Sequence, residues 1–112
     1  MLIKDHIKIT RLAHTTKNMR IGIELNFKFN DSDVKFNIEY TPDNYKIEQY
    51  SLIIYIKELL SSETFDIESL GARFVEDLYD IAVPKQIKIE LEQKVDAITL
   101  KILTQKHQPS FI

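Results

Sequence analysis

Two stretches of strict alternation between apolar and polar residues occupy the first half of the sequence. In residues 19–29, each apolar residue is followed by a polar residue or glycine; the apolar set is Met19, Ile21, Ile23, Leu25, Phe27 and Phe29. Residues 34–40 alternate in the same way after Asn30-Asp31-Ser32-Asp33, a composition typical of turns. A period of two predicts strands with one buried face, so we predict an antiparallel hairpin. A further short strand is expected around residues 7–12, and residues 14–18 are expected to form a turn or a loop.

The spacing then becomes helical. Thr41-Pro42-Asp43-Asn44 is expected to end the strand region, because Pro42 cannot donate to a ladder. From about Glu48 to Leu60 the apolar residues recur at intervals of three and four, which predicts a helix. Ile54 and Tyr55 widen its apolar face, which suggests cover on more than one side, including cover by a partner subunit. A strand over residues 51–56 is the alternative interpretation.

A second helix is predicted by apolar residues at intervals of three and four, namely Ile67, Leu70, Phe74, Leu78 and Ile81. Thr64 or Asp66 is expected to cap its start, and Pro84 to end it. Residues 87–91 and 98–102 alternate again, which predicts two strands joined by the connection Gln93–Ala97. Residues 104–112 are expected to be irregular.

This order of strands, two helices and two strands predicts an α+β fold with the helices on one face of an antiparallel sheet. The chain has 112 residues, so we expect a single domain over residues 1–112. Its composition, 44% hydrophobic and 29% charged, is that of an ordinary globular domain.

Composition excludes several function classes. The sequence has no cysteine, so disulfides, thiolate zinc sites, iron–sulfur clusters and a cysteine nucleophile are all excluded. Its formal net charge of -2 argues against unaided nucleic-acid binding. His6, His14 and His107 lack metal-ligand spacing, so we expect no protein-bound metal. The sequence does not indicate which cofactor, if any, the chain binds. No apolar run is long enough for a membrane helix and no signal peptide is apparent, so we expect no membrane partner and a cytoplasmic location.

Three polar features could carry chemistry. Glu68, near the start of the second predicted helix, could accept two parallel N–H bonds from the edge of a guanine-like or pterin ring, or it could simply complement the helix dipole. Tyr50, Ser51 and Glu48 stand at the entry to the first helix and could contact a ligand or cap the helix. Lys94, in the predicted turn between the last strands, could act as a base if desolvated or be an exposed turn lysine.

An ordered set of residues resembles a known family; its members are Pro42-Asp43, Glu48, Ser51-Leu52, Tyr55, Phe65, Glu68, Asp77-Leu78 and Pro84. The set is similar to the core of the 7-cyano-7-deazaguanine reductase family and of its archaeal amidinotransferase relatives, which act on modified tRNA. The resemblance covers residues 34–92. It implies the tunnelling fold, an oligomeric barrel, and a purine-like or pterin-like ring held by a carboxylate, here Glu68, at a subunit interface.

One departure from that family concerns its chemistry. The family uses a cysteine that adds to the substrate nitrile as a thioimide, and its place here falls near Leu25 or Asn26. Glu24 and Asp31 are nearby acids but cannot replace a thiolate. The family's Phe-His-Glu also loses its histidine, because Asp66 and Ile67 separate Phe65 from Glu68. The resemblance therefore implies the ring pocket without the covalent step.

Dihydroneopterin aldolase, a second tunnelling-fold family, is similar in part. The opening D-H-I-K-I-T-R-L resembles its first strand, and K-V-D-A-I resembles its lysine turn with Val95 in place of proline. This resemblance implies Lys94 as the catalytic base, Tyr50 as a proton relay and Glu68 as the pterin anchor.

Three hypotheses follow. The chain binds a 7-deazaguanine-like ring through Glu68, Ser51 and Glu48; or it is an aldolase of folate biosynthesis that acts on a pterin; or it is a non-catalytic assembly subunit that kept the fold. A homo-oligomer is expected under all three. Nucleic acid is expected only as a modified tRNA substrate.

Overall fold

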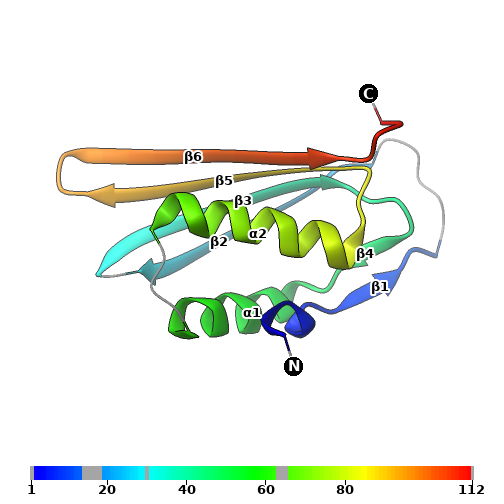
Figure 1. Ribbon diagram of the computed structural model, residues 1–112, viewed down its shortest axis with the longest axis horizontal. Coiled ribbons are helices and arrows are strands. Elements are labelled where there is room, and N and C mark those ends of the chain that lie inside the picture. Colours follow the sequence, from blue (N-terminus) through cyan, green and yellow to red (C-terminus); the bar gives the residue numbers. More distant parts are fainter. Residues whose placement is uncertain (1, 14–18, 30, 63–65, 112) are drawn as a thin grey trace.

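The computed structural model describes residues 2–13, 19–29, 31–62 and 66–111. Strands precede and follow a central pair of helices, as predicted (Figure 1). In chain order the elements are the 3-10 helix η1 (Ile3–His6), β1 (Ile9–Arg11), β2 (Ile21–Phe29), β3 (Ser32–Thr41), β4 (Tyr45–Ile47), α1 (Gln49–Ser62), α2 (Ile67–Ala82), β5 (Gln86–Val95) and β6 (Ile98–His107).

The main sheet has four antiparallel strands in the order β2-β3-β5-β6. The register places Phe36 of β3 opposite Leu25 of β2 and Leu91 of β5, and Leu91 opposite Ile102 of β6. These four side chains therefore lie on one face of the sheet, the inner face, because side chains alternate between faces along each strand. The outer face carries the polar positions of the same strands.

The core lies between the inner face and the two helices. Phe74 of α2 joins them: its ring centroid lies 5.3 Å from that of Phe36 on β3 and 5.6 Å from that of Tyr55 on α1. All three side chains are fully buried. Tyr55 therefore belongs to the core of this chain, whereas Ile54 is 52% exposed and remains available to a partner.

The helix ends follow the capping signals. The side chain of Asp66 accepts a hydrogen bond of 2.7 Å from the backbone N–H of Ser69, which confirms Asp66 as the N-cap of α2. The other candidate, Thr64, lies outside the described residues. At the C-terminal end, Val83 adopts the left-handed conformation with φ 43°, and Pro84 follows it.

Gly71 lets α2 approach the sheet closely. A Cβ atom at this position would lie 3.2 Å from Cγ2 of Ile102 and 3.5 Å from Cδ1 of Leu91. The missing side chain therefore sets the spacing between α2 and strands β5 and β6.

Several strand predictions need correction. Residues 45–47 form β4, which pairs with β1 in a separate two-stranded sheet, Ile9 opposite Ile47. Three residues are too few to show a period of two, so the pattern gave no signal. The predicted turn over residues 30–33 is shorter, because β3 already begins at Ser32. The prediction for residues 14–18 falls outside the described residues.

The C-terminal hairpin is longer than its apolar pattern indicates. We predicted a connection over Gln93–Ala97 and an irregular segment over 104–112; residues 96–97 and 108–111 agree with these predictions, whereas residues 93–95 and 104–107 belong to strands. β5 continues to Val95, β6 continues to His107, and only residues 96 and 97 form the turn. Gln93 and Lys106 interrupt the apolar alternation, yet cross-strand pairing continues through them. In the part of the chain that the structure describes, no helix is long and apolar enough to cross a membrane.

Candidate functional site

Glu68 lies in the first turn of α2 and is exposed. This position combines a carboxylate with the positive end of a helix dipole. The neighbouring cap, Asp66, has its pKa held below the ordinary value because the backbone N–H of Ser69 donates to its carboxylate. Glu68 is thus an accessible anion beside an ordered cap, a suitable acceptor for a pair of N–H donors.

The start of α1 is a tightly bonded cap. The two carboxylate oxygens of Glu48 accept hydrogen bonds of 2.9 Å from the backbone N–H groups of Tyr50 and Ser51. The Ser51 hydroxyl donates to the carbonyl of Glu48 and accepts from the backbone N–H of Lys8. Ser51 is only 3% exposed, and its hydroxyl group links the segment between η1 and β1 to the start of α1. Tyr50, 77% exposed, is the accessible side chain of this group.

Lys94 does not lie in a turn. It is part of β5, opposite Asp33 of β3 and Thr99 of β6. Three positions separate it from the inner-face residue Leu91, so its side chain lies on the outer face. There it lines a shallow hollow of about 170 Å³ with Asn26, Asp33 and Glu92. The helices cover the other face of the sheet.

The predicted site residues therefore fall into three separate places. α1 and α2 are antiparallel, so Glu68 begins α2 at the end of the molecule opposite the start of α1 (Figure 1). The 14 residues of α1 span about 20 Å at 1.5 Å per residue. Glu68 and the Glu48–Ser51 segment can share one ligand only if two copies of the chain meet.

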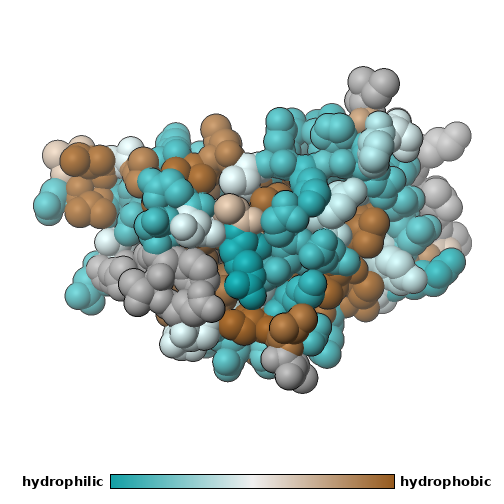
Figure 2. Space-filling view, viewed as in Figure 1, coloured by the Kyte–Doolittle hydropathy of each residue, from teal (hydrophilic) through white to brown (hydrophobic). Residues whose placement is uncertain are grey.

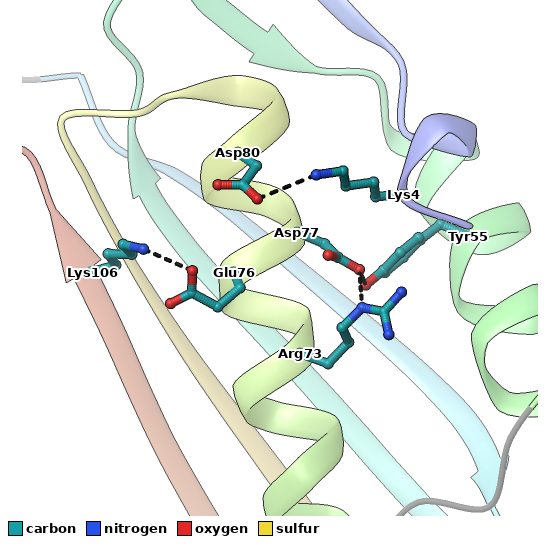
Figure 3. Close-up of polar contacts among 7 residues, drawn as sticks. All are labelled: Lys4, Tyr55, Arg73, Glu76, Asp77, Asp80 and Lys106. Carbon is teal, nitrogen blue, oxygen red and sulfur yellow. Dashed lines mark hydrogen bonds and ion pairs between the residues drawn. The ribbon is translucent and has the colours of Figure 1, made fainter. Parts of the chain in front are cut away.

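A buried polar cluster that the periodicity did not predict joins the two helices (Figure 3). The Tyr55 hydroxyl donates to Oδ2 of Asp77 at 2.6 Å, and Nε of Arg73 donates to the same oxygen at 2.8 Å. Asp77 is 5% exposed. Burial, and then the hydrogen bond to Asp77, raise the pKa of Tyr55 far above its ordinary value. Its sequence signal is an acid between the apolar positions Phe74 and Leu78, with Arg73 four residues earlier.

Two ion pairs surround this cluster at the surface of α2 (Figure 3). Nζ of Lys4 lies 3.4 Å from Oδ2 of Asp80, and Nζ of Lys106 lies 2.7 Å from Oε2 of Glu76. They attach η1 and β6 to the two sides of α2. Within the described ranges, no three histidine, aspartate or glutamate side chains are arranged to hold a metal ion.

Pro42 and Asp43, the first members of the residue set that resembles a known family, take part in packing and hydrogen bonding after β3. Pro42 is buried, and Oδ2 of Asp43 accepts a 3.1 Å hydrogen bond from Nε2 of Gln108, a residue that follows β6. The same amide group donates to the carbonyl of Val83. These contacts hold the turn after β3, the end of α2 and the C-terminal segment together.

Comparison with known proteins supports the resemblance at the level of the fold. No family model matches the sequence, and no curated protein matches it. Among solved structures, the chain is similar to the archaeosine synthase QueF-Like in its apo form, with a TM-score of 0.59 and 12% identity over 80% of this chain and 93% of that chain. The two chains thus share an α+β fold, in accord with the tunnelling-fold relationship that the ordered residue set implies.

Proposed function

We propose that this chain binds the amide–amine edge of a 7-deazaguanine-like ring through Glu68, at a junction between two copies. The observation that carries the proposal is the position of Glu68, exposed in the first turn of α2, in a chain that shares its fold with a protein described as an archaeosine synthase. A carboxylate can accept two parallel N–H bonds from such an edge. This bidentate geometry would favour a ring with paired donors over rings that lack them.

The junction completes the proposed pocket. Glu48 and Ser51 are engaged in the α1 cap, so Tyr50 offers the accessible surface at that end of the helix pair. In a second copy this tyrosine would stack on the ring that Glu68 of the first copy holds. Ser51 and Glu48 would then act mainly by fixing the direction of Tyr50.

The proposed function is to bind a ring of the kind found in the modified nucleosides queuosine and archaeosine. The chain contains no cysteine, so its own side chains cannot form a thioimide with a nitrile. The charge balance disfavours free nucleic acid, and tRNA enters the proposal only as the carrier of a modified base.

Ligand-dependent thermal unfolding tests this proposal. Guanine, a 7-deazaguanine and a pterin would each be added to the wild type, to Glu68→Gln and to Glu58→Gln, which changes an exposed glutamate of α1. A ligand present at 100 times its Kd adds about 2.7 kcal/mol to the free energy of unfolding, a readily measured rise in Tm. We expect a 7-deazaguanine to stabilise the wild type and Glu58→Gln but not Glu68→Gln.

Two other outcomes overturn the proposal. An equal shift in Glu68→Gln would place the ligand elsewhere. The absence of any shift would favour the non-catalytic assembly subunit, a role already compatible with Glu48 and Ser51 serving only as helix-capping residues.

A further inference from the structure

The connection between α2 and β5, residues 83–85, contains a backbone conformation that its sequence disfavours. Val83 has φ 43° and ψ 56°, in the left-handed region, where a β-branched side chain is crowded. The residue that follows, Pro84, adds to the conflict, because a residue before proline prefers an extended backbone. The other non-glycine residues with positive φ among those described, Asp31 and Asp96, are aspartates in hairpin turns, a residue type that enters this region more readily. The connection is therefore strained at Val83.

Burial of the Val83 side chain does not offset this strain. Val83 is 46% exposed, so it buries little apolar area. Figure 2 shows hydrophobic residues gathered at the tip of the β5–β6 hairpin, whereas the connection lies at the opposite end of the molecule (Figure 1). The next residue, Pro84, is buried and fixes the far side of the connection. Hydrogen bonds to the backbone must therefore hold Val83 itself in place.

Gln108, the first residue after β6, supplies hydrogen bonds at both ends of the connection. Its Nε2 atom donates to Oδ2 of Asp43 at 3.1 Å and to the carbonyl oxygen of Val83 at 3.2 Å. Both partners can only accept, so the amide nitrogen must face them, and both of its hydrogens are used. The backbone N–H of Gln108 donates to the carbonyl of Lys85 at 3.0 Å, and the N–H of Lys85 donates to the carbonyl of Thr41 at 2.8 Å.

The last turn of α2 depends on the conformation of Val83. The N–H of Val83 donates to the carbonyl of Tyr79 at 2.9 Å, and this hydrogen bond closes the turn. Asp80 belongs to the same turn, and its Oδ2 lies 3.4 Å from Nζ of Lys4, which attaches η1 to α2. If Val83 changed to an extended backbone, the bond to Tyr79 would break, and the turn that carries Asp80 would open.

We propose that Gln108 is a latch: its hydrogen bonds hold Val83 in the left-handed conformation, and their release opens the last turn of α2 and loosens η1. Strain at Val83 favours the open state and the bonds of Gln108 oppose it, so the segment after β6 sets the balance between the two states. Any binding event that holds residues 108–111 away from Asp43 and Val83 shifts this equilibrium toward the open state. The latch goes beyond the proposed ligand function and operates without a ligand.

Amide hydrogen exchange tests the latch, with the N–H of Lys85 as the reporter because it lies in the connection and no variant alters it. Gln108→Glu keeps the size of the side chain, removes both donors and places a carboxylate beside Asp43. We expect exchange at Lys85 to become about ten times faster in this variant. The N–H of Ile7, which bonds back into η1, should also exchange faster. Gln105→Glu, the same change at an exposed position of β6, is the matched control and should alter neither rate.

Val83→Gly tests the strain itself. Glycine enters the left-handed region without a steric cost, so we expect exchange at Lys85 to become slower than in the wild type. Adding Val83→Gly to Gln108→Glu should likewise slow exchange relative to Gln108→Glu alone. Without strain the result has the opposite sign, because glycine then only adds conformational freedom to the open state. Val83→Asn should change the rate in the same direction as Val83→Gly, since asparagine tolerates the left-handed region.

Each step of the proposal has a result that would overturn it. Equal exchange at Lys85 in the two glutamate variants would show that Gln108 is not a latch. Faster exchange in Val83→Gly would show that the connection is not strained. Faster exchange at Lys85 with an unchanged rate at Ile7 would overturn the link to η1. No ligand is present in these experiments, so failure here is distinguishable from failure of the Glu68 proposal.

Discussion

The Tyr55 hydroxyl lies 2.6 Å from Oδ2 of Asp77, and this hydrogen bond connects α1 to α2 inside the core. Arg73 donates to the same oxygen from the solvent side, so the carboxylate has two donors and little exposure. A buried carboxylate is costly unless it is paired and bonded. The three side chains therefore fix how the two helices pack, and they are the natural place to begin testing the structure.

Tyr55→Phe removes one donor and leaves the Asp77 carboxylate buried with Arg73 alone. We expect the free energy of unfolding to fall by about 1–3 kcal/mol, the usual cost of an unsatisfied buried polar group. Urea denaturation measures this change. Tyr50→Phe is the matched control, because Tyr50 is 77% exposed, and it should leave stability within about 0.5 kcal/mol of the wild type. Equal losses in the two variants would contradict the assigned role of Tyr55.

Two buried tyrosines make the protein sensitive to alkali. Burial raises the pKa of Tyr55 and of Tyr40, the latter despite a hydrogen bond that its oxygen accepts from the backbone N–H of Ile47. A group whose pKa is raised by folding stabilises fully below its unfolded pKa, about 10 for tyrosine, and this contribution is lost as the pH rises further. We therefore expect stability to decline above about pH 10. Comparing urea midpoints at pH 8 and 10.5 checks this; a decline of the same size in Tyr55→Phe would contradict the contribution of Tyr55.

Gly71 tests the spacing between α2 and the sheet. Gly71→Val would force branched carbon atoms against Ile102 and Leu91, and we expect it to destabilise the fold by about 1–3 kcal/mol. Gly71→Ala should cost less, because alanine gains up to about 1 kcal/mol of helix propensity while its Cβ meets Ile102 at 3.2 Å. Ala72→Val, at the exposed neighbouring position, is the control in the same urea experiment. A Gly71→Val variant no less stable than Ala72→Val would show that the helix does not rest on the sheet here.

A substitution at Thr104 is expected to raise the free energy of unfolding. Among the described residues its Oγ1 is a buried oxygen without a hydrogen-bond partner. Thr104→Val replaces that hydroxyl by a methyl group of similar size, so we expect a gain of about 1 kcal/mol in the free energy of unfolding. Thr99→Val, on the exposed part of the same strand, serves as the control for strand propensity. Loss of stability in Thr104→Val would mean that the hydroxyl has a partner after all.

The elements that the sequence predicted correctly are those with long, uninterrupted periods. Residues 19–29 and 34–40 show a period of two because only one face of each strand is buried, and both became strands. The α2 stripe from Ile67 to Ile81 and the Asp66 cap gave the second helix to within a residue. Along such segments the burial of each residue follows from its position in the strand or helix, so the sequence pattern predicts it.

The errors arise where pairing, and not burial, defines the element. β4 has three residues, too few to show a period, and it exists because β1 pairs with it. β6 reaches His107 although Thr104 and Lys106 occupy inner-face positions, because hydrogen bonding to β5 continues. For the candidate site, Glu68 was predicted on the correct turn of the correct helix. The placement of Lys94 was wrong, because a sequence cannot show on which face of a sheet an extended hairpin places a residue until the turn is located.

The position of Lys94 bears on the aldolase hypothesis. Lys94 lies on the outer face, whereas Glu68 belongs to the helix layer on the inner face, so one chain does not bring the two together. We expect no release of glycolaldehyde from dihydroneopterin by the wild type, measured with a coupled assay for the aldehyde. Lys94→Ala and Lys88→Ala, two exposed lysines of β5, complete the set. Release that falls by a factor of about 10² to 10⁴ in Lys94→Ala alone, as loss of a general base produces, would instead show that neighbouring copies assemble an aldolase site.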